Sequence, residues 1–187
     1  MTAIPRESFT YAQYLALEQG SEVKHEYLRG EVWDMAGGTA EHSRLQATVI
    51  RALGNALADR PCSVFTSDLR LRVIETDRST YADVVVICGK VEHPFDDPTA
   101  VTNPVVIVEV LSDSTEASDR GEKFMHYRRI PSLREYVLIS QRAPRIEVFH
   151  REGESWILTD AVTGGAVQLP SLGIPLGVDA VYRDPAA

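Results

Sequence analysis

Two apolar runs each hold one acidic residue: Asp83-Val84-Val85-Val86-Ile87 and Val105-Val106-Ile107-Val108-Glu109-Val110-Leu111. Runs of about four to eight β-branched residues are typical of strands that are buried on both faces of a sheet. A carboxylate in or beside such a strand is costly to remove from water unless a cation or several hydrogen bonds stabilise it. We therefore expect Asp83 and Glu109 to lie on neighbouring strands and to share one site.

The length and composition are those of one soluble domain. The chain has 187 residues, of which 44% are hydrophobic and 25% are charged. No apolar run approaches the roughly 18 residues of a membrane-spanning helix, and residues 1–7 lack the hydrophobic core of a signal peptide. Cys62 and Cys88 fall in separate expected strands without CxxC spacing. We therefore expect no disulfide framework, no cysteine zinc site and a cytoplasmic location.

The net charge of −8 argues against a protein that coats nucleic acid non-specifically. The charge is unevenly distributed. Residues 1–119 hold 10 basic and 19 acidic side chains, residues 120–151 hold 8 and 3, and residues 152–187 hold 1 and 5. The basic section has two interpretations, a surface that faces phosphates or simply solvated helix and hairpin faces.

The order of the expected elements indicates a single α/β domain over residues 1–187. It has an N-terminal helix and hairpin in residues 8–36, a core in residues 40–140 and C-terminal hairpins in residues 145–187. The expected helices are 11–19, 40–59 and 117–129; the expected strands are 62–66, 68–74, 82–88, 104–111 and 135–140; and the expected hairpins are 26–35, turning at Arg29-Gly30, and 145–150, 155–160 and 166–169. Residues 75–80 are expected to form a turn, and residues 89–103 a long mobile loop.

Two acids at the ends of adjacent strands supply hard oxygen ligands that suit Mg²⁺ or Mn²⁺. The carbonyl of Val110, beside Glu109, and a substrate phosphate would complete the shell. A bound ion makes a water more acidic and able to attack phosphorus. The ammonium of Lys123, about a turn into the next expected helix, would orient that water and offset charge on the phosphoryl oxygens.

Two further polar residues lie at the start of the helix expected at 40–59. His42 is interpreted either as a surface or capping residue, or as a group that orients water or contacts phosphate. Glu41 is a second candidate, although the helix dipole already accounts for an acid in the first turn.

Several short segments together resemble one family. They are Tyr81-Ala82-Asp83, Val108-Glu109-Val110-Leu111-Ser112-Asp113-Ser114-Thr115, Asp119-Arg120-Gly121-Glu122-Lys123 and Tyr127-Arg128-Arg129-Ile130-Pro131-Ser132. They look like the Uma-type restriction-endonuclease-like family of the PD-(D/E)XK nuclease superfamily, and the likeness runs from Tyr11 to about Trp156. It implies a restriction-endonuclease-like core, with a mixed central β-sheet flanked by helices and extra β-hairpins. It also implies a Mg²⁺-dependent site in which Asp83 and Glu109 are the two acids.

The chain departs from the superfamily pattern at two positions. Ala82 stands where a proline often precedes the first acid, a change that affects only the entry to the strand. Leu111 stands where a lysine is expected two residues after the second acid, and the family resemblance transfers that role to Lys123. The resemblance also implies site roles for His42 and, as substrate contacts, for Tyr127 and Arg120.

Three functional hypotheses follow. The first is a Mg²⁺- or Mn²⁺-dependent endonuclease that hydrolyses DNA phosphodiester bonds through an activated water. The second is a catalytically weak or inactive member of the fold that binds nucleic acid or assembles with other proteins. The third is a metal-dependent hydrolase with a different substrate. Because duplex cleavage needs two sites, the first hypothesis also predicts a homodimer. No sequence-reading element is evident, and no membrane association is expected.

Overall fold

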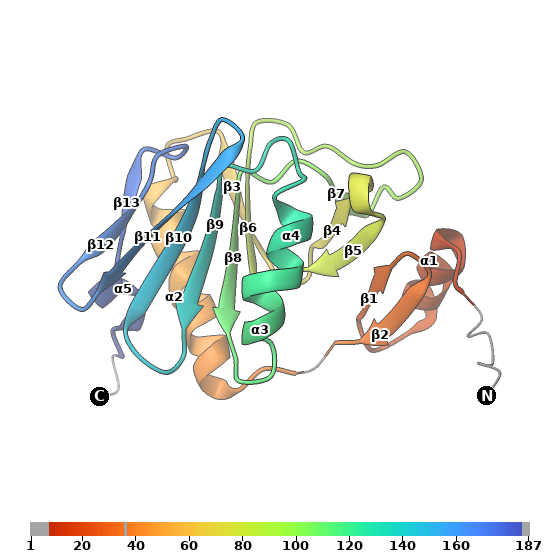
Figure 1. Cartoon of the computed structure of the whole chain (residues 1–187), viewed down its shortest axis with the longest axis horizontal. Coiled ribbons are helices and arrows are strands. Elements are labelled where there is room, and N and C mark those ends of the chain that lie inside the picture. The colour runs from red at the N-terminus through yellow and green to blue at the C-terminus, as the bar shows by residue number, and fades with distance from the viewer. Residues whose placement is uncertain (1–7, 36, 185–187) are drawn as a thin grey trace.

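The computed structural model describes residues 8–35 and 37–184, and Figure 1 shows their arrangement. The expectation for residues 1–7 and the expected boundaries at residues 36 and 187 lie outside the described residues. Helices and strands form a mixed α/β architecture, as expected. No helix within the described ranges is long and apolar enough to cross a membrane.

The larger sheet has six strands in the order β11-β10-β9-β8-β6-β3. In chain order these are β3 (Cys62–Thr66), β6 (Val84–Cys88), β8 (Val106–Leu111), β9 (Glu135–Ser140), β10 (Arg145–Glu152) and β11 (Ser155–Val162). Strands β8 and β9 run parallel and the other neighbours run antiparallel, so the sheet is mixed. The two apolar runs are therefore adjacent strands, with Val84 opposite Val108.

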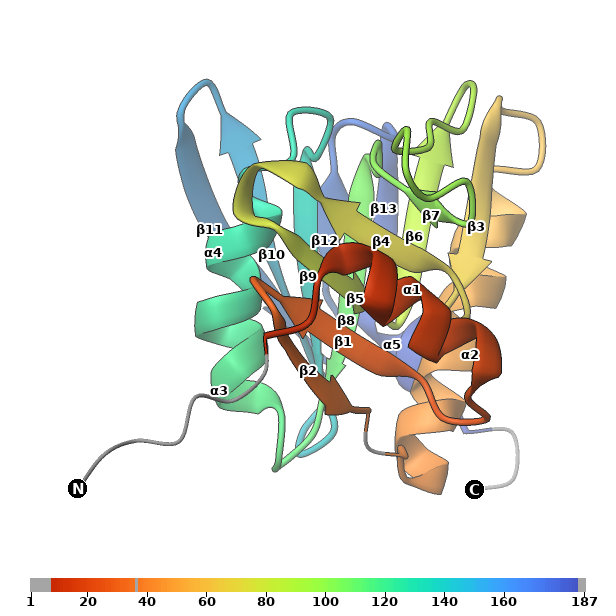
Figure 2. The ribbon, with the colours of Figure 1, turned by 90° about the vertical axis from the view of Figure 1, so that its right-hand side faces the viewer.

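Both faces of the larger sheet are covered by helices, which explains why its central strands are apolar throughout. On one face, Leu45 of α2 (Ala40–Ala56) shares a buried cluster with Val84. On the other face, Val85 shares a second cluster with Tyr127. Figure 2 shows α2 and the helical segment α3–α4 on opposite sides of the sheet.

The helix expected at 117–129 runs from Glu116 to Tyr127 and has a π-helical middle. Its parts are α3 (Glu116–Ser118), η2 (Asp119–Lys123) and α4 (Phe124–Tyr127). π-helical turns are rare and often occur at functional sites. Asp119 and Lys123 are the first and last residues of this one.

A second sheet of five strands, in the order β2-β1-β5-β4-β7, is covered by α1 (Tyr11–Gly20). Its strands are β1 (His25–Leu28), β2 (Glu31–Asp34), β4 (Arg70–Val73), β5 (Arg78–Tyr81) and β7 (Ala100–Val101). The turn expected at 75–80 was too long: η1 (Ile74–Thr76) and Asp77 form the turn, and β5 already begins at Arg78. The loop expected at 89–103 also contains β7, which pairs with β4.

The sequence led us to expect no disulfide framework, but Cys62 and Cys88 form a disulfide. They lie directly opposite each other on the antiparallel strands β3 and β6. A pairing between strands 26 residues apart has no local sequence signature. The cytoplasmic location stays a prediction.

The C-terminal segment closes the face of the sheet that carries α2. The hairpin β10–β11 forms as expected, and β12 (Ala166–Leu169) pairs with β13 (Ile174–Gly177). A short helix, α5 (Val178–Tyr182), follows and was not predicted from the sequence. Its Val178 and Val181 join the cluster formed by α2.

Candidate active site

The two predicted acids meet where β6 begins and β8 ends. The N–H of Asp83 donates to Oε2 of Glu109 at 3.2 Å, and the N–H of Val110 donates to Oδ2 of Asp83 at 2.7 Å. At the end of the β6–β8 pairing, carboxylate oxygens therefore accept hydrogen bonds from the backbone N–H groups, in place of the backbone carbonyls that accept them within a sheet. This exchange fixes the two carboxylates against each other.

Lys123 reaches these acids from the π-helical turn. Its Nζ lies 3.2 Å from Oε1 of Glu109 and 2.9 Å from Oδ1 of Asp119. Burial and the nearby negative charges of Asp119 and Asp83 raise the pKa of Glu109 to about 8, although Lys123 opposes this rise. Burial alone would lower the pKa of Lys123, but the attraction of Glu109 and its neighbours raises it well above the usual value.

Asp119 is a third acid of the site, and the sequence analysis gave it no role. It is 2% exposed, and its Oδ1 is close to Lys123 without the angle of a hydrogen bond. A buried carboxylate oxygen without a hydrogen-bond donor is costly, so its presence here calls for a function. Its spacing of four residues before Lys123 on a helix was the available signal.

His42 approaches from the other side, in the first turn of α2. The side chain of Thr39 caps this helix, and Nε2 of His42 lies 3.2 Å from Oδ2 of Asp83. The hydrogen bond with Asp83 raises the pKa of His42, although burial opposes it. One turn later, the Gln46 side chain donates to the carbonyl of Asp83 at 2.7 Å. Gln46 was not predicted as a site residue.

The remaining candidates have different positions. Tyr127 is fully buried and its hydroxyl donates to Oε1 of Glu109 at 2.9 Å, so it positions the acid and does not face substrate. Arg120 is directed away from the acids, into ion pairs with Glu116 and Glu147. The substrate contact expected of Arg120 therefore has no support in this geometry.

The last two candidates are the backbone carbonyl of Val110 and the side chain of Glu41. Within a strand, the N–H and C=O of one residue point to the same neighbour, so the carbonyl of Val110 faces the Asp83 side. That side also holds His42, whose side chain forms a hydrogen bond with the backbone of Val110. Glu41 pairs with Arg44 at 2.6 Å on the exposed surface of the helix.

The acids, Lys123 and His42 line one cavity of ≈ 440 Å³. The residues of its lining that bear on the chemistry are His42, Asp83, Glu109, Val110, Asp119 and Lys123. Its rim includes hydroxyl side chains of the turn 112–115 and the guanidinium of Arg142. The cavity can admit a phosphate group and water beside three acids and an ammonium.

The donor set fits a hard divalent ion. No cluster of three or more His, Cys, Asp or Glu side chains placed for metal binding occurs in the described part of the chain. The candidate ligands are therefore two carboxylates, from Asp83 and Glu109, with the carbonyl of Val110 and water. Such sparse protein ligation is typical of Mg²⁺, which keeps several waters. The buried Oδ1 of Asp119 already faces a cation, the ammonium of Lys123 at 2.9 Å, so Asp119 is not counted among these ligands.

Several known proteins are similar to this chain. Residues 11–182 match the family described as "Uma2: Putative restriction endonuclease". Two proteins of Synechocystis sp., both described as uncharacterized, are similar: one is 38% identical over 86% of this chain and 91% of its own length, the other 34% identical over 91% and 90%.

A solved structure shows the same fold. It is the crystal structure of "a putative nuclease belonging to DUF820" from Anabaena variabilis, with a TM-score of 0.75 and 18% sequence identity. The similarity covers 93% of this chain and 97% of that one. The restriction-endonuclease-like α/β fold expected from the sequence is thereby confirmed.

Proposed function

The chain belongs to the family described as "Uma2: Putative restriction endonuclease", and on this basis we propose that it is a metal-dependent DNA endonuclease. The proposed reaction is hydrolysis of a phosphodiester bond in the cavity that holds Asp83, Glu109 and Lys123. The observation that carries the proposal is the convergence of these three side chains, with Nζ of Lys123 3.2 Å from Glu109 and the N–H of Asp83 3.2 Å from the same carboxylate.

Asp83 and Glu109, with the carbonyl of Val110, would hold Mg²⁺ or Mn²⁺. The ion would supply Lewis-acid chemistry, making water more acidic and neutralising negative charge on the phosphate. Both acids are fixed by hydrogen bonds from backbone N–H groups, so the ligands are preorganised.

The other side chains act on protons and charge. Lys123 keeps its proton on Nζ and offsets the negative charge that develops on the phosphoryl oxygens. His42 holds a proton on the ring at the opposite side of Asp83, where it can orient water or donate to a leaving oxygen. Tyr127 and Asp119 are positioning residues, because they act through Glu109 and Lys123.

The test is a nicking assay on supercoiled plasmid with Mg²⁺ or Mn²⁺, and with EDTA as the metal-free control. We expect Asp83→Asn, Glu109→Gln and Lys123→Met each to lower the nicking rate by roughly 100-fold or more. Glu154→Gln, which changes an exposed acid in the β10–β11 turn, should match the wild type. Equal nicking by all five proteins would show that the activity arises elsewhere.

A second function is favoured by one observation. Both carboxylate oxygens of Glu109 already accept hydrogen bonds from the protein, from Asp83, Lys123 and Tyr127. The cluster could then be purely structural, in a protein that binds nucleic acid or assembles without cutting. A rise in melting temperature with millimolar Mg²⁺ or Mn²⁺ that Asp83→Asn abolishes supports the enzyme. No rise at all favours the non-catalytic protein.

A further inference from the structure

A second hollow, of ≈ 720 Å³, carries two aromatic rings, the cation of Arg29 and the exposed acid Glu31. Its lining includes Phe9, just before α1, Arg29 in the β1–β2 turn, and Trp33 of β2. Phe9 and Trp33 are 39% and 36% exposed, although rings of this size are mostly buried in folded proteins. Arg29 is exposed and donates to the carbonyl of Thr76, without an ion pair to any acid of the described residues.

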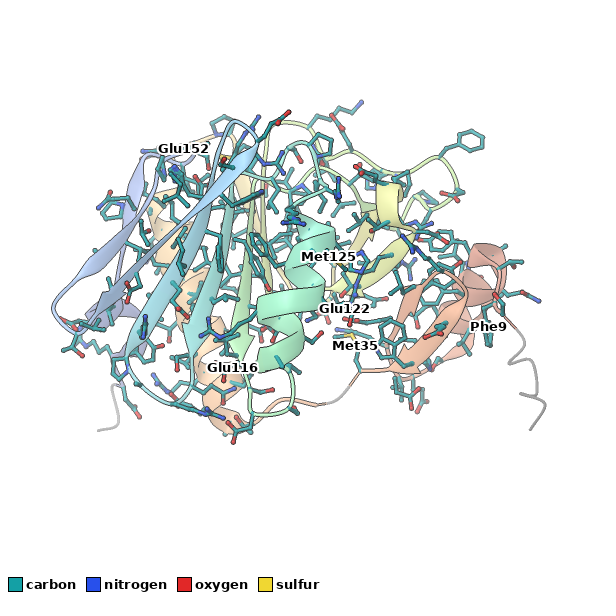
Figure 3. All side chains as sticks on the ribbon, in the orientation of Figure 1. Phe9, Met35, Glu116, Glu122, Met125 and Glu152 are labelled. Atoms are coloured by element: carbon teal, nitrogen blue, oxygen red, sulfur yellow. A yellow bond between two sulfur atoms is a disulfide. The ribbon has the colours of Figure 1, made fainter. Side chains whose placement is uncertain are left out.

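This hollow adjoins the catalytic cavity along one extended segment. Trp33 lines the hollow, and Met35, two residues later, lines the catalytic cavity. Met35 continues the pairing of β2, since its N–H donates to the carbonyl of Lys24 at 2.9 Å. Residues two apart in a strand lie on the same face, about 7 Å from each other. In Figure 3, Met35 lies at the end of the hairpin nearer the α3–α4 helix and Phe9 at the other end.

The ring of Trp33 is held by a buried arginine that also connects it to the catalytic helix. The guanidinium carbon of Arg78 lies 5.7 Å from the ring centroid, and Arg78 is 1% exposed. The same guanidinium donates to Glu26 and to Glu122, both at 2.8 Å. Glu122 directly precedes Lys123. The aromatic surface is therefore preformed and is fixed relative to the catalytic ammonium.

We propose that Trp33 is a stacking surface for an unpaired base of DNA, one nucleotide from the phosphate that enters the catalytic cavity, with Arg29 contacting the adjoining backbone. This inference rests on the proposed nuclease function and narrows its substrate to DNA that contains unpaired nucleotides. Bases in an intact duplex stack on each other, whereas an unpaired base offers its face to an aromatic side chain. The net charge of −8 also favours a site that contacts few phosphates over a long duplex footprint.

The first test measures binding without cleavage. Fluorescence anisotropy in EDTA would compare a short labelled single strand with the same strand annealed to its complement. Trp33→Leu keeps apolar bulk but loses the π face, and should weaken single-strand binding roughly ten-fold or more while changing duplex binding little. Trp33→Phe should retain most of the affinity. Phe95→Leu removes a fully exposed ring of loop 89–103 and is the matched control. Single-strand binding that is equally tight in Trp33→Leu and the wild type would overturn the proposal.

The second test uses the emission of Trp33 itself. The chain has 2 tryptophans, so Trp156→Phe leaves Trp33 as the single reporter. Addition of unlabelled single strand should quench its emission, and addition of duplex should not; unchanged emission in both cases contradicts stacking. The two proposals fail separately. Binding that depends on Trp33 in a protein that cleaves neither plasmid nor single-stranded DNA with Mg²⁺ or Mn²⁺ contradicts hydrolysis alone. If the protein nicks plasmid but Trp33→Leu binds single-stranded DNA as tightly as the wild type does, only this inference is contradicted.

Discussion

Asp119 influences the candidate site through Lys123, since their charged atoms lie 2.9 Å apart and Asp119 is 2% exposed. We predict that Asp119→Asn lowers kcat roughly ten-fold and leaves KM for DNA nearly unchanged. Loss of this anion should also lower the pKa of Lys123, so the alkaline limb of the pH–rate profile should move to lower pH. A lower melting temperature with an unmoved alkaline limb would mean that Asp119 is only structural.

Gly38 leaves the space that the ring of His42 occupies. A Cβ on Gly38 would lie 2.9 Å from Nδ1 of His42, whereas a Cβ on Gly37 would meet nothing within 4 Å. We predict that Gly38→Ala turns the ring away from Asp83 and lowers kcat roughly ten-fold or more, with Gly37→Ala as the matched control. The raised pKa of His42 should return toward its usual value, as read by NMR titration. An unchanged titration in Gly38→Ala would contradict this.

The residues of the site differ in how well the sequence alone predicts their roles. Asp83 and Glu109 interrupt apolar runs, where an unpartnered acid is costly, so they stood out. Lys123 was placed by its position about a turn into the helix after Glu109, and the family resemblance strengthened that role, because a lone lysine on a helix has no local feature that separates it from a solvated one. Asp119 and Gln46 read as ordinary polar residues of helix surfaces. Only the packing of their helices against the ends of β6 and β8 shows that Asp119 lines the cavity and that Gln46 donates to the carbonyl of Asp83.

At the scale of elements, strands with apolar runs or alternating polarity were predictable, and the polar strand β5 was not. The expected strands at 62–66 and 135–140 match β3 and β9 residue for residue. In contrast, β5 reads as polar, Arg78-Ser79-Thr80-Tyr81, yet all four residues are buried. Its burial depends on Glu26, which accepts from both Arg78 and Thr80. Such partners are distant in sequence, so no local pattern reveals them.

The disulfide links β3 to β6, the strand that follows Asp83. In the chain-entropy account, closing a loop of 26 residues stabilises the fold by about 3.5 kcal/mol. We predict that reduction with dithiothreitol lowers the free energy of unfolding by about that amount, as measured by urea denaturation. The paired substitution Cys62→Ser and Cys88→Ser should reproduce the loss and make the protein insensitive to the reductant. If the denaturation midpoint of the wild type is the same with and without the reductant, the disulfide does not stabilise the fold.

Loop 89–103 is anchored by Asp97, which is 1% exposed and accepts from Arg70 at 2.9 Å. Burial would raise the pKa of Asp97, but hydrogen bonds from Arg70, Thr99 and Tyr11 outweigh it and lower the pKa to about 2. Relative to the ordinary 3.8, this contributes about 2 kcal/mol of stability above pH 4, which is lost as the pH falls toward 2.

Two substitutions test this anchor. Asp97→Asn should destabilise the protein by about 2 kcal/mol or more at pH 7, and the difference from the wild type should shrink as the pH approaches 2. Asp96→Asn changes the exposed neighbour and should leave the stability unchanged at every pH. Urea denaturation at several pH values measures both. A difference for Asp97→Asn that stays constant between pH 7 and pH 3 would contradict the assigned cause.

For the whole molecule, the structure separates the two interpretations of the basic section. Five of the eight basic side chains in residues 120–151 form ion pairs with acids; these are Arg120, Lys123, Arg129, Arg142 and Arg145. The pair of Lys123 is buried in the site, and the charges of the other four are largely offset by their acidic partners. The section is therefore mostly a set of neutralised helix and hairpin faces, and DNA contact would depend on the cavity and the hollow beside it.

A single chain carries one set of Asp83, Glu109 and Lys123, so under the proposed function each chain would cut one strand at a time. The homodimer stays a prediction, and the products of plasmid cleavage test it. Open circles should form first, and linear DNA should form at a rate that rises more steeply with protein concentration than nicking does, because two chains must act on one duplex. Gel time courses at several concentrations, with sedimentation under the same conditions, measure this. Linear DNA formed without an open-circle intermediate, by a chain that sediments as a monomer, would contradict it.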